Sequence, residues 1–143
     1  MRELYIGGMA QGKLDYVREK MRVEGVTAKY YDCGAWRTDV PAVEKNVEAT
    51  GGNDATAVGV FYHFHLWVRH MILTGMDAEQ AFARFLECYP DWILISDEVG
   101  NGIVPMEKAE REYRECLGRL LIEAAKRADR VERILCGLGQ RIK

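Results

Sequence analysis

The segment GGMAQGKL near the N-terminus spaces glycines and a lysine in a way that can bind phosphate. Gly7, Gly12 and Lys13 fit the pattern G-x-x-x-x-G-K-[ST], in which backbone N–H groups point at a phosphate and the lysine reaches the outer phosphates. The last position of that pattern is a hydroxyl that holds Mg²⁺, and here it is Leu14. The pattern therefore predicts an anion site that has lost a metal ligand.

Two other interpretations of this segment stay open. The glycines can serve only a strand-to-helix turn, or the loop can hold the phosphate of some other small metabolite, because backbone N–H groups and a lysine bind an anion without a metal. If the loop binds a nucleotide, ATP or GTP, seven residues would contact its phosphates. These are Gly7, Gly8, Met9, Ala10, Gln11, Gly12 and Lys13.

The histidines His63, His65 and His70 all lie at or just after an apolar run that reads as a strand. Alternate residues of a strand share one face, so His63 and His65 are candidates for a ligand contact or a metal site. The spacing indicates no fourth ligand, and single histidines are more often polar edges of a packed core. We predict a ligand contact for His63 and His65, and no metal site.

Glu98 follows the apolar run WILIS and is the third candidate for a ligand contact. Parallel strands place ligands at their carboxyl ends, so Glu98, Lys13 and the histidines are expected to converge on one cleft. The alternative is that Gly100 and Gly102 shape a turn that Glu98 caps.

Composition narrows the class of partner. The chain has 143 residues and a formal net charge of −2, so no overall field favours nucleic acid or an anionic membrane. Its apolar runs are shorter than a membrane span, and the start MRELYIGG does not resemble a signal peptide. We expect a cytoplasmic protein.

The four cysteines are widely separated and form no metal-binding spacing. We expect reduced, mostly buried thiols at Cys33, Cys88, Cys116 and Cys136, with Cys136 packing at the end of an apolar strand.

Short apolar runs alternate with segments of helical period, which predicts one α/β domain over residues 1–143 with a mainly parallel sheet of about five strands. The expected strands are residues 3–6, 27–31, 57–62, 92–96 and 133–136. The first expected helix begins at about Gly12, two more flank a break at Gly75, and the last runs from about Met106 to Arg130.

Several phrases occur in one order that resembles the adenosylcobinamide kinase / adenosylcobinamide-phosphate guanylyltransferase family. They are WRT at 36–38, LWVRHMIL at 66–73, ISDEVGNGIVP at 95–105, REYRECLGR at 111–119 and ILCGLGQRIK at 134–143. The resemblance implies a P-loop fold, a nucleoside triphosphate at the glycine loop, phosphoryl transfer to a cobinamide, and guanylyl transfer through a histidine. It also implies a corrinoid ligand and a homotrimer.

The sequence lacks three groups on which the chemistry of the family depends. Leu14 lacks the metal-binding hydroxyl, and the acid that the family has at the end of its third strand falls on Tyr62. The helix that carries the guanylylated histidine is absent, because only four residues separate Tyr31 from Trp36. These losses argue against bound Mg²⁺.

Two functions follow. One is an active transferase re-equipped with other residues, and the other is a catalytically impaired nucleotide-binding relative that acts through a partner subunit; the three losses favour the second. Assembly as a homo-oligomer is expected also because five aromatic residues offer more apolar surface than so short a chain would bury. They are Tyr30, Tyr31, Trp36, Phe61 and Phe64.

Overall fold

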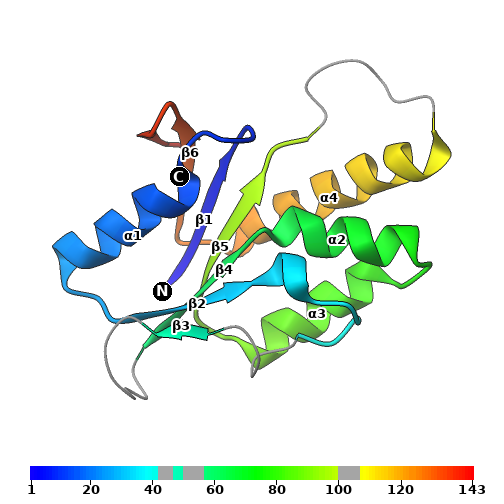
Figure 1. The fold of residues 1–143 in the computed structure, drawn as a ribbon, viewed down its shortest axis with the longest axis horizontal. Coiled ribbons are helices and arrows are strands. Elements are labelled where there is room, and N and C mark those ends of the chain that lie inside the picture. The colour runs from blue at the N-terminus through cyan, green and yellow to red at the C-terminus, as the bar shows by residue number, and fades with distance from the viewer. Residues whose placement is uncertain (42–46, 50–56, 100–106) are drawn as a thin grey trace.

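The computed structural model describes residues 1–41, 47–49, 57–99 and 107–143 (Figure 1). These residues form a seven-stranded sheet with the order β3-β2-β4-β5-β1-β6-β7. The strands are β1 (Arg2–Gly7), β2 (Ala28–Asp32), β3 (Val47–Ala49), β4 (Val58–Tyr62), β5 (Trp92–Asp97), β6 (Arg130–Leu135) and β7 (Leu138–Arg141).

The five inner strands are parallel, and the two edge strands are antiparallel to their neighbours. The expected α/β fold with a mainly parallel sheet is confirmed. The sheet has two strands more than expected, β3 and β7. The sequence did not predict them because VEA and LGQR are short and contain no apolar run. The inner strands are mostly buried on both faces, and this burial explains the apolar runs in their sequences.

Four helices cover the sheet in the described part of the chain. They are α1 (Lys13–Glu24), α2 (Phe64–Leu73), α3 (Ala78–Cys88) and α4 (Lys108–Arg127). Helix α1 lies on one face, whereas α2, α3 and α4 lie on the other (Figure 1). As expected, α2 and α3 are separated at Gly75, which has a φ of 76°, and the Asp77 carboxylate caps α3 by accepting from the Gln80 N–H.

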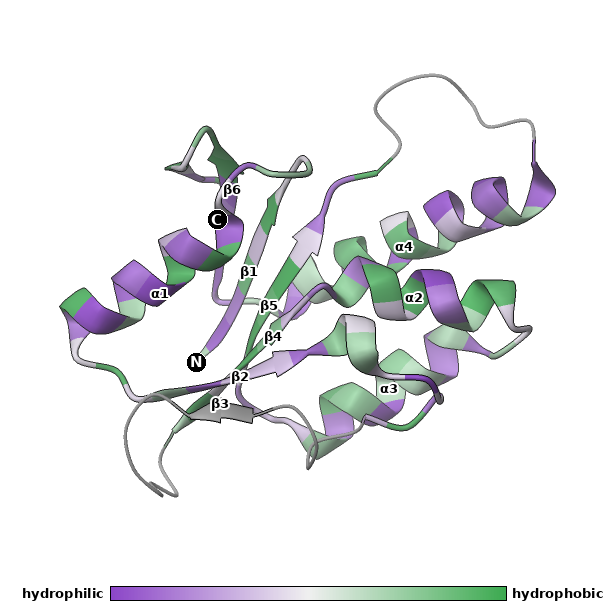
Figure 2. Cartoon of the chain, in the orientation of Figure 1, coloured by the Kyte–Doolittle hydropathy of each residue, from purple (hydrophilic) through white to green (hydrophobic). Residues whose placement is uncertain are grey.

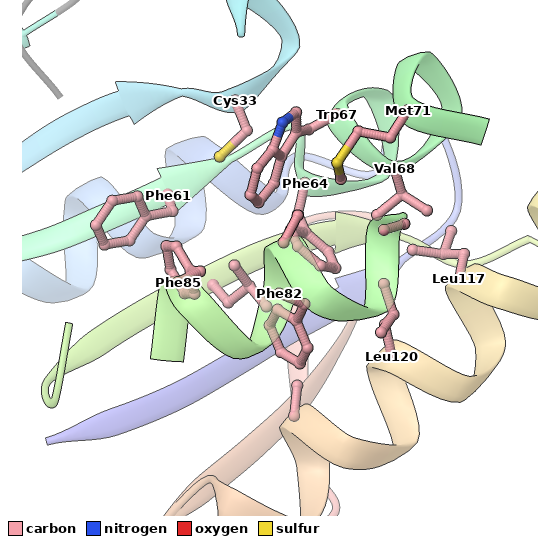
Figure 3. Close-up of a cluster of buried hydrophobic side chains, with 14 of the residues drawn as sticks. Cys33, Phe61, Phe64, Trp67, Val68, Met71, Phe82, Phe85, Leu117 and Leu120 are labelled. Carbon is pink, nitrogen blue, oxygen red and sulfur yellow. The ribbon is translucent and has the colours of Figure 1, made fainter. Parts of the chain in front are cut away.

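Each face of the sheet has its own apolar core. Figure 2 shows how α4 alternates apolar with polar residues, as a helix packed on one side requires. The larger core joins β4, α2, α3 and α4 around Phe61, Trp67 and Phe85 (Figure 3). The smaller one, which includes Val17 and Met21, lies under α1.

The five aromatic residues that were expected to form an interface between subunits are buried in these two cores. Tyr31 is 8% exposed, and Tyr30, Trp36, Phe61 and Phe64 are each 3% exposed or less. The expectation that they exceed what the chain can bury is wrong. Oligomerisation stays a prediction from the family resemblance.

The C-terminal boundary differs from the expected one. Helix α4 ends at Arg127 and β6 starts at Arg130, because the Asp129 N–H donates to the Arg2 carbonyl and joins the chain to β1. Cys136 follows β6 in a turn with a φ of 51° and is exposed, so its expected burial is wrong. Cys88 is exposed too, while Cys33 and Cys116 are buried.

Two of the sequence phrases pack against each other. The rings of Trp36 and Trp67 meet edge to face, with centroids 4.8 Å apart. The Trp67 Nε1–H donates to the Thr38 carbonyl at 2.8 Å, and His70 Nε2 lies 3.0 Å from the Arg37 carbonyl. The segment WRT is therefore anchored on helix α2.

No helix in the described residues is long and apolar enough to span a membrane.

Candidate functional site

The glycine loop, residues 7–13, connects β1 to α1 at the carboxyl edge of the sheet (Figure 1). Helix α1 begins at Lys13, next to the expected start at about Gly12, and Gly12 is its N-cap with a φ of 78°. Gly7 is required for a different reason. A Cβ there would lie 2.5 Å from the Ile134 carbonyl oxygen of β6, so the two strands can approach only without a side chain.

The C-terminal hairpin fastens the glycine loop from the side. The Gln11 side-chain oxygen accepts from the Cys136 N–H at 2.7 Å, and the Gln11 carbonyl accepts from the Gly137 N–H at 2.9 Å. Two backbone donors of the β6–β7 turn thus hold one loop residue. These two hydrogen bonds fix the loop to the β6–β7 turn.

A cavity of about 480 Å³, called here the edge cleft, opens beside the loop. It is lined by Met9, Ala10, Gln11, Gly12, Lys13, Leu14, Asp15, Tyr62, His63, His65, Leu66, Ile95, Ser96 and Asp97. The expected convergence of Lys13 with His63 and His65 is therefore present. Gly7 and Gly8 lie at the start of the loop and outside this lining.

Lys13 is held by two groups at the floor of the edge cleft. Its Nζ donates to the Gly8 carbonyl at 2.7 Å and lies 2.6 Å from the Asp97 carboxylate, and the residue is only 8% exposed. Asp97 was missed by sequence reasoning, although it ends the strand beside β1 and pairs in register with Gly7. The available signal was its place directly after the run WILIS.

His65 packs against the other side of Asp97. The Asp97 N–H donates to His65 Nδ1 at 3.1 Å, so that nitrogen carries a lone pair and the neutral ring has its proton on Nε2. Nε2 lies 3.3 Å from the Asp97 carboxylate. Burial lowers the pKa of His65, outweighing the opposite effect of the Asp97 charge. The Asp97 carboxylate thus faces a lysine and a neutral histidine.

His63 lies at the junction of β4 and α2, with a φ of 57°. Its Nδ1 is 2.9 Å from the Asp32 carboxylate, and that carboxylate also accepts from the Gly34 N–H at 2.9 Å. The side chain is 48% exposed. His63 is therefore oriented by a carboxylate of the neighbouring strand β2 while it remains accessible from the edge cleft.

Two other candidates lie elsewhere. Glu98 extends the β1–β5 pairing through its N–H, which donates to the Gly7 carbonyl at 2.7 Å, and its carboxylate is 3.2 Å from the Arg133 guanidinium. It does not line the edge cleft. His70 points at the WRT segment. Gly100 and Gly102, which were expected to shape a turn after Glu98, lie outside the described residues.

Residues 36–142 match the family "Cobinamide kinase / cobinamide phosphate guanyltransferase". The chain belongs to this family. The match covers well over half of the sequence and starts after the glycine loop. The interpretation of that loop as a binding site therefore depends on its geometry and not on the family match. It includes the phrases from WRT onward, except for Lys143 at the end of the last one.

Two curated relatives were found for parts of the chain. The bifunctional adenosylcobalamin biosynthesis protein CobU of Escherichia coli strain K12 is 31% identical over 67 residues, which are 47% of this chain and 37% of that protein. Its namesake from Salmonella typhimurium strain LT2 is 38% identical over 56 residues, which are 39% of this chain and 31% of that protein. The matches span about a third of the relatives' length.

The edge cleft fits a protein-held Mg²⁺ poorly. Leu14 and Tyr62 both line it, but one side chain has no oxygen and the other has a phenol instead of a carboxylate. Asp97 is already paired with Lys13. Among the described residues, no group of three His, Cys, Asp or Glu side chains is arranged to hold a metal ion. This part of the chain holds no preformed metal site.

Proposed function

We propose that this member of the cobinamide kinase / cobinamide phosphate guanyltransferase family binds the phosphates of ATP or GTP at the glycine loop, with its catalysis of cobinamide phosphorylation and guanylyl transfer impaired. The observation that carries the proposal is the placement of Lys13 in a cleft beside the N-terminus of α1. Family membership alone would not identify this site, because the family match begins after the loop.

The local charges support an anion at this position. The first N–H groups of α1 have no partner within the helix and carry the positive end of its dipole. Lys13 adds a cation whose ammonium has three donors, of which Gly8 and Asp97 use two. Among the described residues the third donor has no partner, and it can bind a phosphate oxygen. Asp97 stands close to that position, so a bound phosphate competes with it for the lysine.

Impaired catalysis is proposed from what the edge cleft contains. Phosphoryl transfer depends on neutralising the phosphates, mostly through Mg²⁺ and the P-loop lysine. Lys13 is present, but Leu14 and Tyr62 supply no metal ligand. The segment between β2 and Trp36 is the short 3₁₀ helix η1 (Cys33–Ala35), which has no histidine. The family's guanylyl-accepting residue has no counterpart there.

A second candidate is a non-catalytic nucleotide- or phosphate-binding subunit that acts through a partner. The same three losses favour it. Cobinamide as the second ligand, and assembly as a homotrimer, are proposed from family membership alone.

Calorimetric titration tests both candidates. ATP and GTP are titrated into the protein with and without Mg²⁺, and cobinamide phosphorylation is assayed in the same mixtures. We expect metal-independent binding and no turnover. Rapid Mg²⁺-dependent turnover of cobinamide would contradict impaired catalysis, and the absence of binding by either nucleotide would contradict both candidates.

A further inference from the structure

We propose that His63 accepts the terminal phosphoryl group of a nucleoside triphosphate bound at the glycine loop, forming a phosphohistidine at Nε2. The proposal rests on nucleotide binding at that loop. It assigns a covalent step to a histidine at the end of β4, a position that sequence reasoning treated only as a ligand contact.

The three histidines differ in which nitrogen is free. Both nitrogens of His65 face Asp97, and its side chain is only 10% exposed. His70 uses Nε2 toward the Arg37 carbonyl and is not part of the edge cleft. His63 uses only Nδ1, so within the described residues its Nε2 has no hydrogen-bond partner. A nucleophile needs such an uncommitted lone pair.

Asp32 gives His63 the form that a nucleophile requires. A carboxylate can only accept, so the neutral ring places its proton on Nδ1 and keeps its lone pair on Nε2. The same carboxylate stabilises the positive charge that develops when Nε2 is phosphorylated, as an orienting acid does in other His-Asp pairs.

The surroundings fix this pair in place. A Cβ on Gly34 would lie 3.0 Å from the Asp32 carboxylate and 3.4 Å from the His63 Cβ, so the turn after β2 packs closely around both groups. The Tyr62 ring meets the His63 ring at a centroid distance of 4.9 Å. His63 has a left-handed φ, which is uncommon for residues other than glycine although histidine adopts it more readily than most, and such backbone gathers at functional sites.

The sheet order places His63 on the same edge of the sheet as the glycine loop. Along the carboxyl edge the strands run β2, β4, β5, β1, so Asp32, His63, Asp97 and the glycine loop follow one another. A P-loop lysine contacts the outer phosphates of a triphosphate. Because His63 and Lys13 line the same cleft, we assign the terminal phosphorus to the position beside His63.

The step balances with the nucleotide as its only co-reactant. The Nε2 lone pair forms a bond to the terminal phosphorus, and the bond from that phosphorus to the bridging oxygen breaks. ADP or GDP leaves with the bonding pair. The ring becomes a phosphorylated imidazolium whose Nδ1 proton stays hydrogen-bonded to Asp32. Lys13 neutralises part of the charge on the phosphates, and Mg²⁺ that enters bound to the nucleotide would neutralise the rest, so this single transfer does not require a metal ligand from the protein.

Labelling with radioactive nucleotide tests the proposal. The purified chain is incubated with ATP or GTP labelled at either the α or the γ phosphorus, with and without Mg²⁺ in the buffer, and quenched in alkali because phosphohistidine is labile in acid. We expect label from the γ position only, and mass spectrometry should place a phosphate on the peptide that contains His63. Nucleotide binding is measured in parallel by calorimetry.

Four variants make the test specific. His63→Asn should abolish labelling and still fold, because asparagine tolerates the left-handed backbone at this position. Asp32→Asn keeps the acceptor for Gly34 and should slow labelling roughly 10²-fold or more. His70→Gln should label like the parent, and Lys13→Gln should lose label together with nucleotide binding.

Nucleotide binding without γ label in the parent would overturn the covalent step and leave the proposed function standing. Label from the α position, or undiminished label in His63→Asn, would also overturn it. If neither nucleotide binds nor labels, both the covalent step and the proposed function are wrong.

Discussion

The Lys13 ammonium, at the start of helix α1, and the Asp97 carboxylate, at the carboxyl end of β5, lie 2.6 Å apart, so the lysine of the glycine loop is paired with an acid of its own chain. The two side chains are mostly buried, which keeps water from screening the pair. Any phosphate that binds Lys13 must therefore overcome the attraction of Asp97 and its own repulsion from that carboxylate.

Replacing Asp97 by Asn should tighten metal-free nucleotide binding. The amide keeps the size of the side chain but removes the charge, and we expect affinity to rise about tenfold, equivalent to about 1.4 kcal/mol. The control is Asp15→Asn, which removes an exposed charge at the rim of the same cleft without touching Lys13. The measurement is the affinity of the nucleotide for both variants and for the parent, determined by calorimetry without Mg²⁺. Weaker binding in Asp97→Asn would mean that the carboxylate helps to hold the ligand.

Gly7→Ala should destabilise the fold, because its Cβ would lie 2.5 Å from a carbonyl oxygen of β6 and would push the strands apart. We expect a loss of about 2 kcal/mol in the free energy of unfolding, measured by urea denaturation. Gly118→Ala is the matched control. It lies within α4 with nothing within 4 Å of its added Cβ, and it should gain about 0.5–1 kcal/mol. Equal effects at both sites would show that strand approach at Gly7 is unimportant.

His65 should make stability fall as the solution is acidified below pH 6.5. In the folded protein, burial lowers the pKa of this side chain below its ordinary value of 6.5. The unfolded chain therefore takes up the proton first as the pH falls, and protonation favours unfolding. The contribution is complete above pH 6.5 and declines as pH falls toward the folded pKa. Urea midpoints at pH 7.5 and 5.5 should differ less in His65→Gln than in His70→Gln. The same pH slope in both variants would rule out this assignment.

The sequence predicted the fold class because burial of inner parallel strands on both faces leaves continuous apolar runs. It missed β3 and β7 because edge strands need no such runs. For the edge cleft it predicted the glycine loop, His63 and His65, which do line the cleft, but it predicted Glu98 instead of Asp97. Neighbouring side chains on a strand point to opposite faces, so only one of these acids can face Lys13. Which one does so depends on the register of β5 against β1, and that is fixed only by tertiary packing.

Leu14→Ser alone should not restore cobinamide phosphorylation, although it completes the P-loop pattern. One hydroxyl is a single ligand for an ion that prefers six oxygens, and Tyr62 still offers no carboxylate. Because Leu14 packs against the core under α1, its loss should also lower stability by about 2 kcal/mol. The double variant with Tyr62→Asp is the smallest change that we expect to bind Mg²⁺. Turnover by the single variant at roughly 1 to 100 per second would show that Tyr62 is not the missing acid.

The affinity of ATP and GTP for the parent and for Lys13→Gln tests the central claim most directly. Lys126→Gln is the matched control, because it makes the same charge change at an exposed position in the last turn of α4. If the glycine loop holds the phosphates, at least one nucleotide binds the parent and Lys126→Gln equally, and Lys13→Gln binds it at least about tenfold more weakly, a difference of about 1.4 kcal/mol. Equal binding by the parent and Lys13→Gln would contradict the account.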